Sequence, residues 1–579
     1  MLSISRIDSV SYYETLAKNE YYTKRGEPDG HWGSGSGRLR LAKGQKVESE
    51  ALKKIMSGFD LDGNKMVQNA GKDGMRVGMD LTFSTPKSVS IVWANASVEL
   101  RENISTIHDQ SIEKALQYLT SKVATRRGKN SVQHEPVSSL IYAAFEHCNT
   151  RANDPELHSH IVLSNTCFRQ DGTTGAIDNA EIFTHKMSAG ALYRAELADG
   201  LRACGFPIEV DPKNPGCFQI AGMDKSLEKH FSKRSERIKE IAREKGITSA
   251  RTKNEIAVYT RGKKDEVNRE GLFKNWQAEC VSRGFTRSSI DELKTTQTKP
   301  YAVPSPEQLI EKLTENENTF SLKDIERVTF EQGQFAPFDR EKFKGELLAH
   351  ADVVRLQIDG ATCYTSRALM MLEQNIIDGA KARANESIHH LDAVHVATNI
   401  VEVEALQGFQ LKDEQREAVE HLTTKSGGVA LLRGVAGAGK TTALKAVSEA
   451  FKSAGFEVLG TTISAQASSV LARETGIQTD TTAQLLIDLG RGKKYLARKC
   501  VLIIDEAGML GSRAFAKLQS YADQAGAKML LVGDENQLQS IAVGGVFKAL
   551  QIHAGIAPSK LKEINRQGDA RDREASQLF

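Results

Sequence analysis

A glycine-rich segment between an apolar run and a helical run constrains the fold of this chain most strongly. Residues 429–433 (Val-Ala-Leu-Leu-Arg) predict a short buried strand, and residues 434–441 match the pattern G-x4-G-K-T. A glycine loop that joins a strand to a helix in this way is the phosphate-binding loop of nucleotide hydrolases. Its surroundings therefore have to form an α/β domain, and the chain from about residue 408 onward alternates strand and helix patterns as a parallel sheet requires.

Each type of residue in this loop has a separate task. The glycines Gly434, Gly437 and Gly439 let consecutive backbone N–H groups turn inward and cradle phosphate oxygens. Lys440 would reach the β- and γ-phosphates, and Thr441 would bind Mg²⁺. The N-terminus of the following helix adds its positive dipole. We therefore predict that ATP with Mg²⁺ binds here.

Two more apolar runs end in polar residues that complete such a site. Residues 501–504 lead into Asp505, which would bind Mg²⁺ through water, and Glu506, which would activate the attacking water. Residues 529–532 lead into a polar segment in which Gln537 is placed to sense the γ-phosphate. As a set, these residues predict nucleotide hydrolysis.

The same region resembles the RecD-like branch of superfamily 1 DNA helicases. Gln415 matches the adenine-reading glutamine, residues 461–465 match the first single-strand contact motif, and Arg566 matches an arginine that touches the γ-phosphate. Such helicases carry a second RecA-like domain, and the sequence ends 13 residues after Arg566 without one. We therefore expect no DNA unwinding by this chain alone, whether it is an expression fragment or a naturally interrupted gene.

Length and composition set the broad limits. A chain of 579 residues predicts three to four domains at about 150 residues each. With 40% apolar and 26% charged residues the chain is globular, and a net charge of +3 means that any surface for nucleic acid is local. The seven cysteines contain no C-x-x-C pair, which argues against a disulfide framework or a cysteine zinc site. The sequence has no apolar run of about 18 residues and does not open like a signal peptide, so we expect a cytoplasmic protein without stable membrane insertion.

Three histidines are the sharpest feature of the N-terminal half. His147 follows an apolar strand, and His158 and His160 flank Ser159 where the next strand begins. Residues i and i+2 of a strand share a face, so an antiparallel hairpin would bring His147 beside the other two. Three converging imidazoles form a divalent-metal site with open positions. The alternative is that these histidines are structural, because H-x-H alone is a weak pattern.

Two tyrosine pairs and an aspartate extend this pattern. Tyr12-Tyr13 and Tyr21-Tyr22 lie nine residues apart, and Asp80 begins a strand. Tyrosine pairs are commonly packing residues, but a tyrosine hydroxyl is also a nucleophile toward phosphate once its proton is removed. Asp80 could orient a histidine, accept that proton, or simply cap a loop.

Together these segments resemble the MobF-class conjugative relaxases of the TraI/TrwC type. The resemblance rests on S-Y-Y…Y-Y at 11–22, on D-x-T-F-S-x-P-K-S-V-S at 80–90, and on H-x-x-x-R-x-x-D-P-x-L-H-x-H at 147–160. It covers essentially the whole chain, because a relaxase domain, a connector and a RecD-like motor follow in the family's order. It implies an α+β relaxase domain with an antiparallel sheet, related to rolling-circle initiators.

The resemblance also implies roles for single residues. Tyr12 would attack the scissile phosphate at an origin of transfer and form a 5′-phosphotyrosine, and Tyr21 would serve a second strand transfer at termination. Asp80 would assist tyrosine and histidine. The implied ligands of a divalent metal, Mg²⁺ or Mn²⁺, are His147, His158 and His160. The implied partners are single-stranded and hairpin DNA at a plasmid origin, accessory relaxosome proteins and a coupling protein of a type IV secretion system, with translocation into a recipient cell.

The expected domains are a relaxase at 1–295, a small helical or winged-helix-like connector at 307–407, and an α/β RecA-like ATPase at 408–579. A linker is expected at 298–306, which holds three of the twelve prolines. Three other interpretations stay open. They are a DNA-dependent ATPase or helicase whose N-terminal region only binds DNA, a rolling-circle replication initiator or transposase, and a non-enzymatic scaffold at the origin of transfer.

Overall fold

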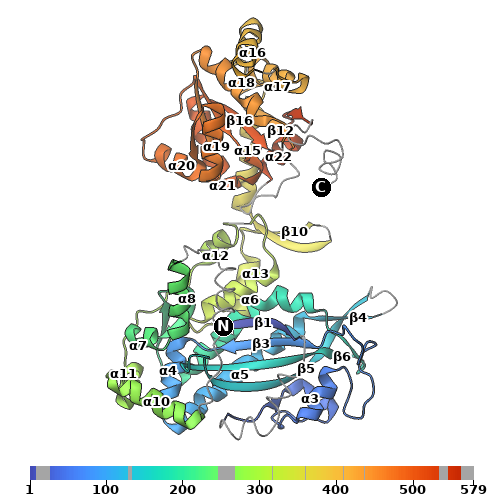
Figure 1. Cartoon of the computed structure of the whole chain (residues 1–579), viewed down its shortest axis with the longest axis vertical. Coiled ribbons are helices and arrows are strands. Elements are labelled where there is room, and N and C mark those ends of the chain that lie inside the picture. The colour runs from blue at the N-terminus through green and yellow to red at the C-terminus, as the bar shows by residue number, and fades with distance from the viewer. Residues whose placement is uncertain are drawn as a thin grey trace. The chain divides into compact units, whose positions relative to one another are not determined.

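The computed structural model describes residues 1–7, 27–127, 133–244, 268–315, 317–358, 360–408, 410–435, 437–533 and 545–562 (Figure 1). The chain forms two compact units. The N-terminal unit consists of residues 1–304 together with 323–346, and the C-terminal unit consists of 305–322 and the chain from 347 onward. The predicted connector at 307–407 is thus divided between two units, where the chain length had suggested three to four domains.

A seven-stranded antiparallel sheet forms the centre of the N-terminal unit. Its order is β1-β3-β6-β5-β2, with β4 pairing with β5 and β7 pairing with β6. Its strands are β1 (Leu2–Ile7), β2 (His31–Trp32), β3 (Gly78–Ser84), β4 (Ala124–Arg127), β5 (Gln133–Asn149), β6 (Pro155–Arg169) and β7 (Thr174–Ala176). A separate hairpin consists of β8 (Ile208–Asp211) and β9 (Asn214–Ile220). The antiparallel α+β architecture agrees with the sequence-based expectation.

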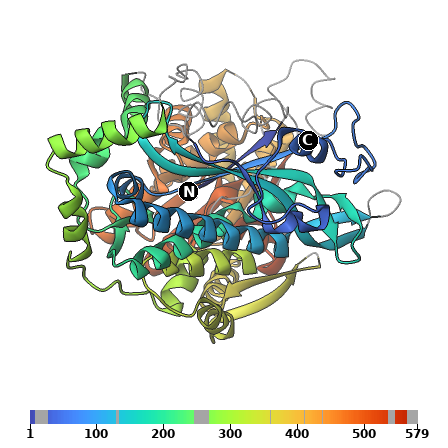
Figure 2. The same cartoon turned by 90° about the horizontal axis from the view of Figure 1, so that it is seen from below.

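Helices and loops cover both faces of this sheet (Figure 2). Side chains alternate along each strand, so Ile161 and Leu163 of β6 pack with the long helices α5 and α6, while Val162 packs with α3. The helices of this unit are η1 (Ser34–Leu39), α3 (Ser49–Met56), α4 (Lys87–Asn95), α5 (Val98–Lys122), α6 (Asn179–Ala203), α7 (Lys225–His230), α8 (Lys233–Glu244), α10 (Arg269–Ser282), α11 (Arg287–Lys294), α13 (Leu322–Gly333) and α14 (Arg340–Ala349).

Ion pairs and a hydrogen bond join α13 and α14 to helices α5 and α6 of the N-terminal unit. Glu326 of α13 accepts a hydrogen bond from the Tyr118 hydroxyl (2.8 Å) and pairs with Lys122 (2.6 Å) on α5. Arg340 of α14 pairs with Glu196 of α6 at 2.7 Å. These contacts explain why residues 323–346 fold with the N-terminal unit although they follow the proline-rich linker.

The C-terminal unit contains a six-stranded parallel sheet in the order β14-β13-β15-β16-β12-β17, as its alternating pattern predicted. Its strands are β12 (Val429–Gly434), β13 (Glu457–Thr462), β14 (Gln478–Thr481), β15 (Cys500–Ile504), β16 (Lys528–Gly533) and β17 (Ser559–Leu561). Its helices are α12 (Pro306–Leu313), α15 (Arg367–Arg383), α16 (Ala393–Gln407), α17 (Asp413–Thr424), α18 (Lys440–Ser453), α19 (Ala465–Thr475), α20 (Thr482–Gly490), η3 (Ala507–Met509), α21 (Ser512–Ala525) and α22 (Val546–His553).

Both faces of this parallel sheet are buried. Val429 and Leu431 of β12 face the core formed with α21 and α22, and Ala430 and Leu432 face the core formed with α17 and α18. Burial on both faces explains why these strands read as continuous apolar runs. The carboxyl ends of the parallel strands lie at one edge, where this class of fold places its ligand.

A two-stranded hairpin, β10 (Val353–Ile358) and β11 (Ala361–Ser366), also belongs to the C-terminal unit. Phe320 forms an isolated antiparallel bridge with Tyr364 of β11. In chain order the expected connector contains helices α12, α13 and α14, then this hairpin, and then helices α15 and α16. All seven cysteines are free thiols. Within the described ranges, no helix combines the length and the apolar character needed to cross a bilayer.

Candidate active sites

The β5–β6 hairpin brings the three histidines of the N-terminal half together. His147 of β5 pairs directly with His158 of β6, and Phe145 pairs with His160. The centroids of the three imidazole rings lie 5.3 to 5.5 Å apart. The spatial convergence predicted from the sequence is therefore present.

Strand β3 supplies the carboxylate that orients one of these rings. Thr82 is the register partner of His160, and this register brings Asp80 to the histidine. Asp80 Oδ2 lies 2.8 Å from His160 Nδ1, and the Thr82 hydroxyl lies 3.3 Å from the same nitrogen. His158 Nδ1 lies 2.9 Å from the carbonyl oxygen of Glu156. Polar partners on Nδ1 of both rings leave Nε2 as the nitrogen to face a ligand.

The donor set is suitable for a divalent metal ion. Three imidazoles backed by a carboxylate and a carbonyl are a common arrangement around transition metals. Three rings that share one ion at about 2.1 Å would have centroids roughly 5 Å apart, close to the separations observed. With the rings as they stand, no group of three or more His, Cys, Asp or Glu side chains in the described part of the chain is arranged to hold a metal ion.

The predicted nucleophiles Tyr12 and Tyr21 lie outside the described residues. The described chain on either side of them ends at this sheet. Ile7, the last residue of β1, pairs with Gly78 of β3. Glu27, where the description resumes, lies beside His147 with 4.0 Å between its Oε1 and His147 Nδ1.

A charged cluster next to His147 was not found from the sequence. Arg269, at the start of α10, pairs with Glu27 (2.7 Å) and with Glu146 of β5 (2.8 Å). The Cys148 thiol also donates to Glu27, at 3.3 Å. Burial works against the charge of Arg269, but Glu146 and Glu27 outweigh it and raise the pKa of the guanidinium. Glu27 and Arg269 are 242 positions apart, and no local pattern marks either residue.

A second buried network supports the histidine strand from its opposite face. His108 of α5 lies 3.1 Å from the Ser159 hydroxyl through Nε2 and 2.8 Å from the Tyr193 hydroxyl through Nδ1. Burial lowers the pKa of His108 to about 3, so the ring is neutral and has one donor and one acceptor nitrogen. Ser159 lies between His158 and His160, and its bond to His108 fixes the strand at that point.

Two glycines of the loop in the C-terminal unit have left-handed backbone torsions. Gly437 and Gly439 have φ values of 82° and 79°, in the left-handed region that favours glycine. A Cβ atom on Gly434 would lie 2.9 Å from Lys440 Cγ. Lys440 Nζ donates to the Gly434 carbonyl at 2.6 Å, and Thr441 follows in the first turn of α18.

The two acidic residues predicted for this site follow β15 directly. Asp505 donates its backbone N–H to Thr461 O (3.0 Å), and its Oδ1 accepts from the N–H of Glu506 (2.9 Å). Burial raises the pKa of Asp505, and burial and the charge of Asp505 raise the pKa of Glu506. Glu506 has a φ of 55°, an uncommon conformation for a residue other than glycine and one that often marks a functional site.

Gln415 lies against the same loop, and its Nε2 is 3.4 Å from the carbonyl oxygen of Gly439. The structure thus gathers Gln415, the glycine loop, Asp505 and Glu506 at one edge of the parallel sheet. Gln537 and Arg566 lie outside the described residues.

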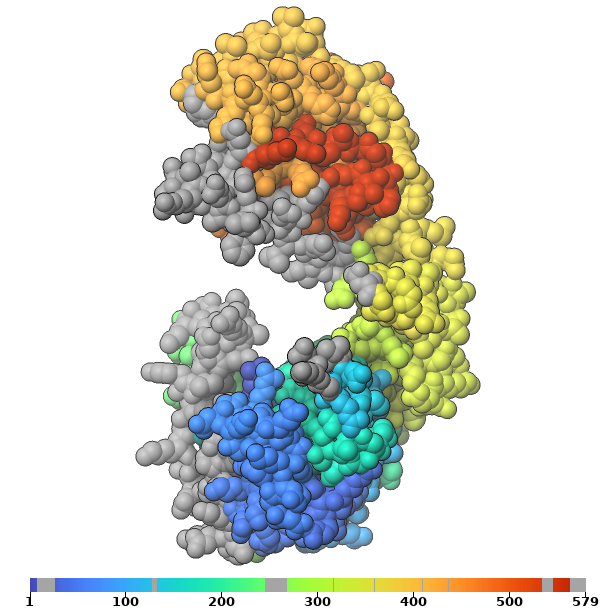
Figure 3. Space-filling model, turned by 90° about the vertical axis from the view of Figure 1, so that its right-hand side faces the viewer, coloured from blue at the N-terminus to red at the C-terminus, as the bar shows by residue number. Residues whose placement is uncertain are grey.

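A basic groove forms a third candidate site, on the N-terminal unit. Its volume is about 940 Å³, and residues 65–69 and strands β4, β6 and β7 contribute to its walls. In Figure 3 the blue surface of the early chain adjoins the cyan and teal surface of these strands. The cations in the wall are Lys65, Arg76, Arg126, Arg127 and Arg169.

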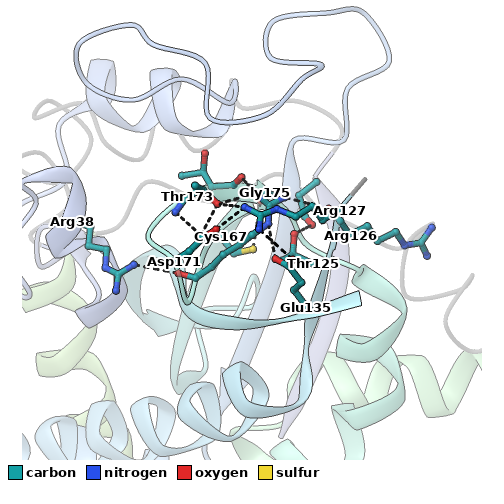
Figure 4. Close-up of polar contacts among 12 residues, drawn as sticks. Arg38, Thr125, Arg126, Arg127, Glu135, Cys167, Asp171, Thr173 and Gly175 are labelled. Carbon is teal, nitrogen blue, oxygen red and sulfur yellow. Dashed lines mark hydrogen bonds and ion pairs between the residues drawn. The ribbon is translucent and has the colours of Figure 1, made fainter. Parts of the chain in front are cut away.

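Carboxylates and hydroxyls hold several of these arginines in place. Arg127 contacts Asp171 (2.6 Å), the Thr173 hydroxyl (3.0 Å) and Glu135 (3.3 Å), as Figure 4 shows. Arg126 pairs with Asp178 at 2.8 Å. Sequence reasoning missed this groove because its cations come from separate segments.

Comparisons with known families fit both halves of the molecule. Residues 7–282 match the TrwC relaxase family, and residues 410–579 match an AAA domain family. The conjugal transfer protein TraA of Rhizobium radiobacter is 31% identical over 300 residues, which is 50% of this chain and 26% of TraA. The multifunctional conjugation protein TraI of Escherichia coli K12 is 27% identical over 355 residues, 56% of this chain and 19% of TraI.

Among solved structures, the metal-bound conjugative relaxase TrwC in complex with oriT DNA is 28% identical, with a TM-score of 0.45. The match covers 50% of this chain and all of that one. The chain spans about a quarter of the length of the curated TraA relative and less of TraI. This chain therefore contains a TrwC relaxase domain at 7–282 and an AAA domain at 410–579, and it is homologous to the TraA and TraI conjugal transfer proteins. The family resemblance and the fold class expected from the sequence are confirmed.

Proposed function

We propose that this chain is a conjugative DNA relaxase that nicks one strand of plasmid DNA at an origin of transfer and remains covalently attached to it. The observation that carries the proposal is the cluster of His147, His158 and His160 with Asp80 behind His160, inside the segment that matches the relaxase family. We further propose that the relaxase function lies within 1–295 and the nucleotide site within 408–579, with 307–407 as the connector between them.

The proposed reaction is a transesterification. The Tyr12 oxygen attacks the scissile phosphorus, the bond from phosphorus to the 3′ oxygen breaks, and a 5′-phosphotyrosine and a free 3′-hydroxyl result. The tyrosine proton passes to Asp80, and the departing 3′ oxygen takes up a proton. One phosphodiester bond replaces another, so the reaction is reversible and needs no ATP. Tyr21 performs the second transfer at termination.

The proposed metal ligands are His147, His158 and His160, with Mg²⁺ or Mn²⁺ as the ion. When bound, a divalent ion draws charge from a non-bridging phosphate oxygen. The protein's own contribution is to hold the rings, through Asp80 on His160 and the Glu156 carbonyl on His158.

The basic groove suits the duplex part of a DNA hairpin. Lys65 and Arg76 are exposed in its wall, and the carboxylate partners of Arg126 and Arg127 prearrange those guanidinium groups for phosphate oxygens. The single strand that follows the hairpin would reach the histidine cluster. Accessory relaxosome proteins and a coupling protein of a type IV secretion system are the proposed protein partners, and transfer with the DNA from the bacterial cytoplasm into a recipient cell is the proposed route.

The AAA domain is proposed to bind ATP with Mg²⁺. In this proposal Gly434, Gly437, Gly439, Lys440 and Thr441 hold the phosphates and the ion, and Gln415 reads the adenine. Asp505 binds the ion through water and Glu506 activates the attacking water. Gln537 and Arg566 sense the γ-phosphate.

Denaturing gels test the nicking proposal directly. The purified chain is mixed with single-stranded DNA that contains an origin of transfer, with Mn²⁺ and without ATP. We expect a covalent adduct that Tyr12→Phe and His158→Ala abolish, while Tyr13→Phe, the neighbouring tyrosine, serves as the matched control and keeps it. An adduct that survives Tyr12→Phe would refute the assignment of the nucleophile. No adduct with any divalent metal would leave the N-terminal unit with a DNA-binding role only.

A further inference from the structure

The Glu27–Arg269–Glu146 cluster is charged and yet largely buried. The side chains of Glu27, Arg269 and Glu146 are 6%, 16% and 12% exposed. Burying charges in this way is costly, and well-packed apolar side chains would stabilise the fold as well or better. A role in placing another group explains the cluster better than stability does.

The group that this cluster touches is His147. Glu27 Oε1 lies 4.0 Å from His147 Nδ1, and the same oxygen accepts from the Cys148 thiol at 3.3 Å. The separation from His147 exceeds a direct hydrogen bond, but a small rotation of the imidazole ring or one bridging water would close it.

Aromatic rings fix the guanidinium group that holds Glu27. The Arg269 guanidinium lies 5.5 Å from the centroid of the Trp93 ring and 5.7 Å from that of Phe273. Its two terminal nitrogens then point at different carboxylates, Glu27 on one side and Glu146 on the other. Arginine suits this task because its donors form a planar fork, whereas lysine presents a single point charge.

We propose that Glu27, held by Arg269, is the positioning residue of His147, in the way that Asp80 is for His160. The inference rests on the proposed metal site. The carboxylate sets which nitrogen of His147 carries the proton and how the ring is turned, so that the other nitrogen faces the ion. Two of the three histidines thus have a carboxylate behind them, and His158 has the Glu156 carbonyl.

The test measures Mn²⁺ binding by the full chain without DNA or ATP, followed by electron paramagnetic resonance of the free ion. We expect Glu27→Gln to raise the Kd for Mn²⁺ by about 10- to 100-fold, the usual effect of removing a carboxylate behind a ligating histidine. The rate of adduct formation should recover toward that of the parent at saturating Mn²⁺, because the carboxylate acts through the metal. Arg269→Lys keeps the charge but not the fork, and we expect an intermediate Kd.

Glu326→Gln is the matched control. Glu326 is also a 6% exposed carboxylate, paired with Lys122 and bonded to Tyr118, but it belongs to α13 and contacts helix α5 instead of the histidines. An unchanged Kd in Glu27→Gln, or an equal shift in Glu326→Gln, overturns the inference while the proposed function stands. If the parent itself binds no Mn²⁺ and forms no adduct, the proposed function fails and the inference fails with it.

Discussion

The two sites of this chain are built in opposite ways. The nucleotide site takes most of its residues from one continuous stretch, in which glycine backbone torsions aim N–H groups and Lys440 lies next to its loop. The histidine cluster takes its residues from β3, β5 and β6, and the sheet register alone brings Asp80, His147 and His160 together. The nucleotide site therefore depends mainly on the backbone torsions of its loop. The histidine cluster depends on the strand register and on the groups that orient its imidazole rings.

This difference has a consequence for sensitivity to substitution. A one-residue slip of β6 against β5 would turn His158 and His160 to the other face of the sheet. The bond between His108 and Ser159 opposes such a slip. Glu27 lies beside His147 and restricts how its imidazole ring can turn. The glycine loop instead takes its shape from its own backbone torsions, with Gln415 against it.

The largest expected effect tests whether the two sites are independent. Lys440→Ala should weaken binding of a fluorescent ATP analogue by about 100-fold or more, roughly 3 kcal/mol, because it removes the cation for the phosphates. The same variant should form the covalent DNA adduct within about twofold of the parent, because transesterification needs no ATP. His147→Ala should show the reverse pattern, with an adduct below about 1% of the parent and normal nucleotide binding.

Adduct formation is measured on gels without ATP, and nucleotide binding is measured by titration without DNA, so each measurement reports on one site. Lys445→Ala, on the same helix as Lys440 but outside the G-x4-G-K-T pattern, is the matched control for the loss of a cation from α18. If Lys440→Ala also lost the adduct, the two sites would not act separately.

An intermediate effect on Mn²⁺ binding is expected at Asp80, which orients the ligand His160 and is not itself a proposed ligand of the ion. Asp80→Asn keeps the size of the side chain but removes the charge that faces His160 Nδ1 at 2.8 Å. We expect about 10- to 100-fold weaker Mn²⁺ binding and a matching loss in adduct rate at low Mn²⁺. Asp178→Asn, which alters a carboxylate paired with Arg126, is the control and should leave Mn²⁺ binding unchanged. Any part of the adduct rate that saturating Mn²⁺ does not restore measures proton transfer to Asp80, and an unchanged Kd for Mn²⁺ would refute its role in orienting His160.

The extent to which sequence predicted each site follows from the same contrast. The strand before Gly434, the acidic residues after β15 and the three histidines could be predicted because each group comes from a short stretch of sequence with a recognisable spacing. Asp80 was recognisable as a strand residue, but its contact with His160 needed the β3–β6 register. Glu27 with Arg269, and His108 with Ser159, were not readable because each pair joins distant segments through side chains. No sequence pattern predicted that the expected connector is divided between two units. That division depends on ion pairs that Glu326 and Arg340 form with side chains of α5 and α6.

The smallest expected effect concerns acid stability of the histidine-bearing unit. His108 has a pKa of about 3 in the folded chain because it is buried, against about 6.5 when unfolded. Between these values the unfolded chain binds a proton that the folded chain does not, so the free energy of unfolding falls as the pH falls from 6.5 toward 3. The contribution of His108 is fully present above pH 6.5 and declines by up to about 1.4 kcal/mol per pH unit below it.

Tryptophan fluorescence isolates this unit, because Trp32, Trp93 and Trp276 all belong to it. In urea titrations from pH 7 to pH 4, His108→Gln should be less stable than the parent at pH 7 by about 1–3 kcal/mol, since it disturbs the bonds to Ser159 and Tyr193. The gap should narrow as the pH falls, because glutamine does not titrate. Lys528→Met is the control: Lys528 is a buried lysine of the C-terminal unit whose pKa burial lowers to about 7, and its removal should leave the tryptophan-detected curve unchanged. A gap between parent and His108→Gln that stays constant from pH 7 to pH 4 would mean that the buried ring is not what makes this unit sensitive to acid.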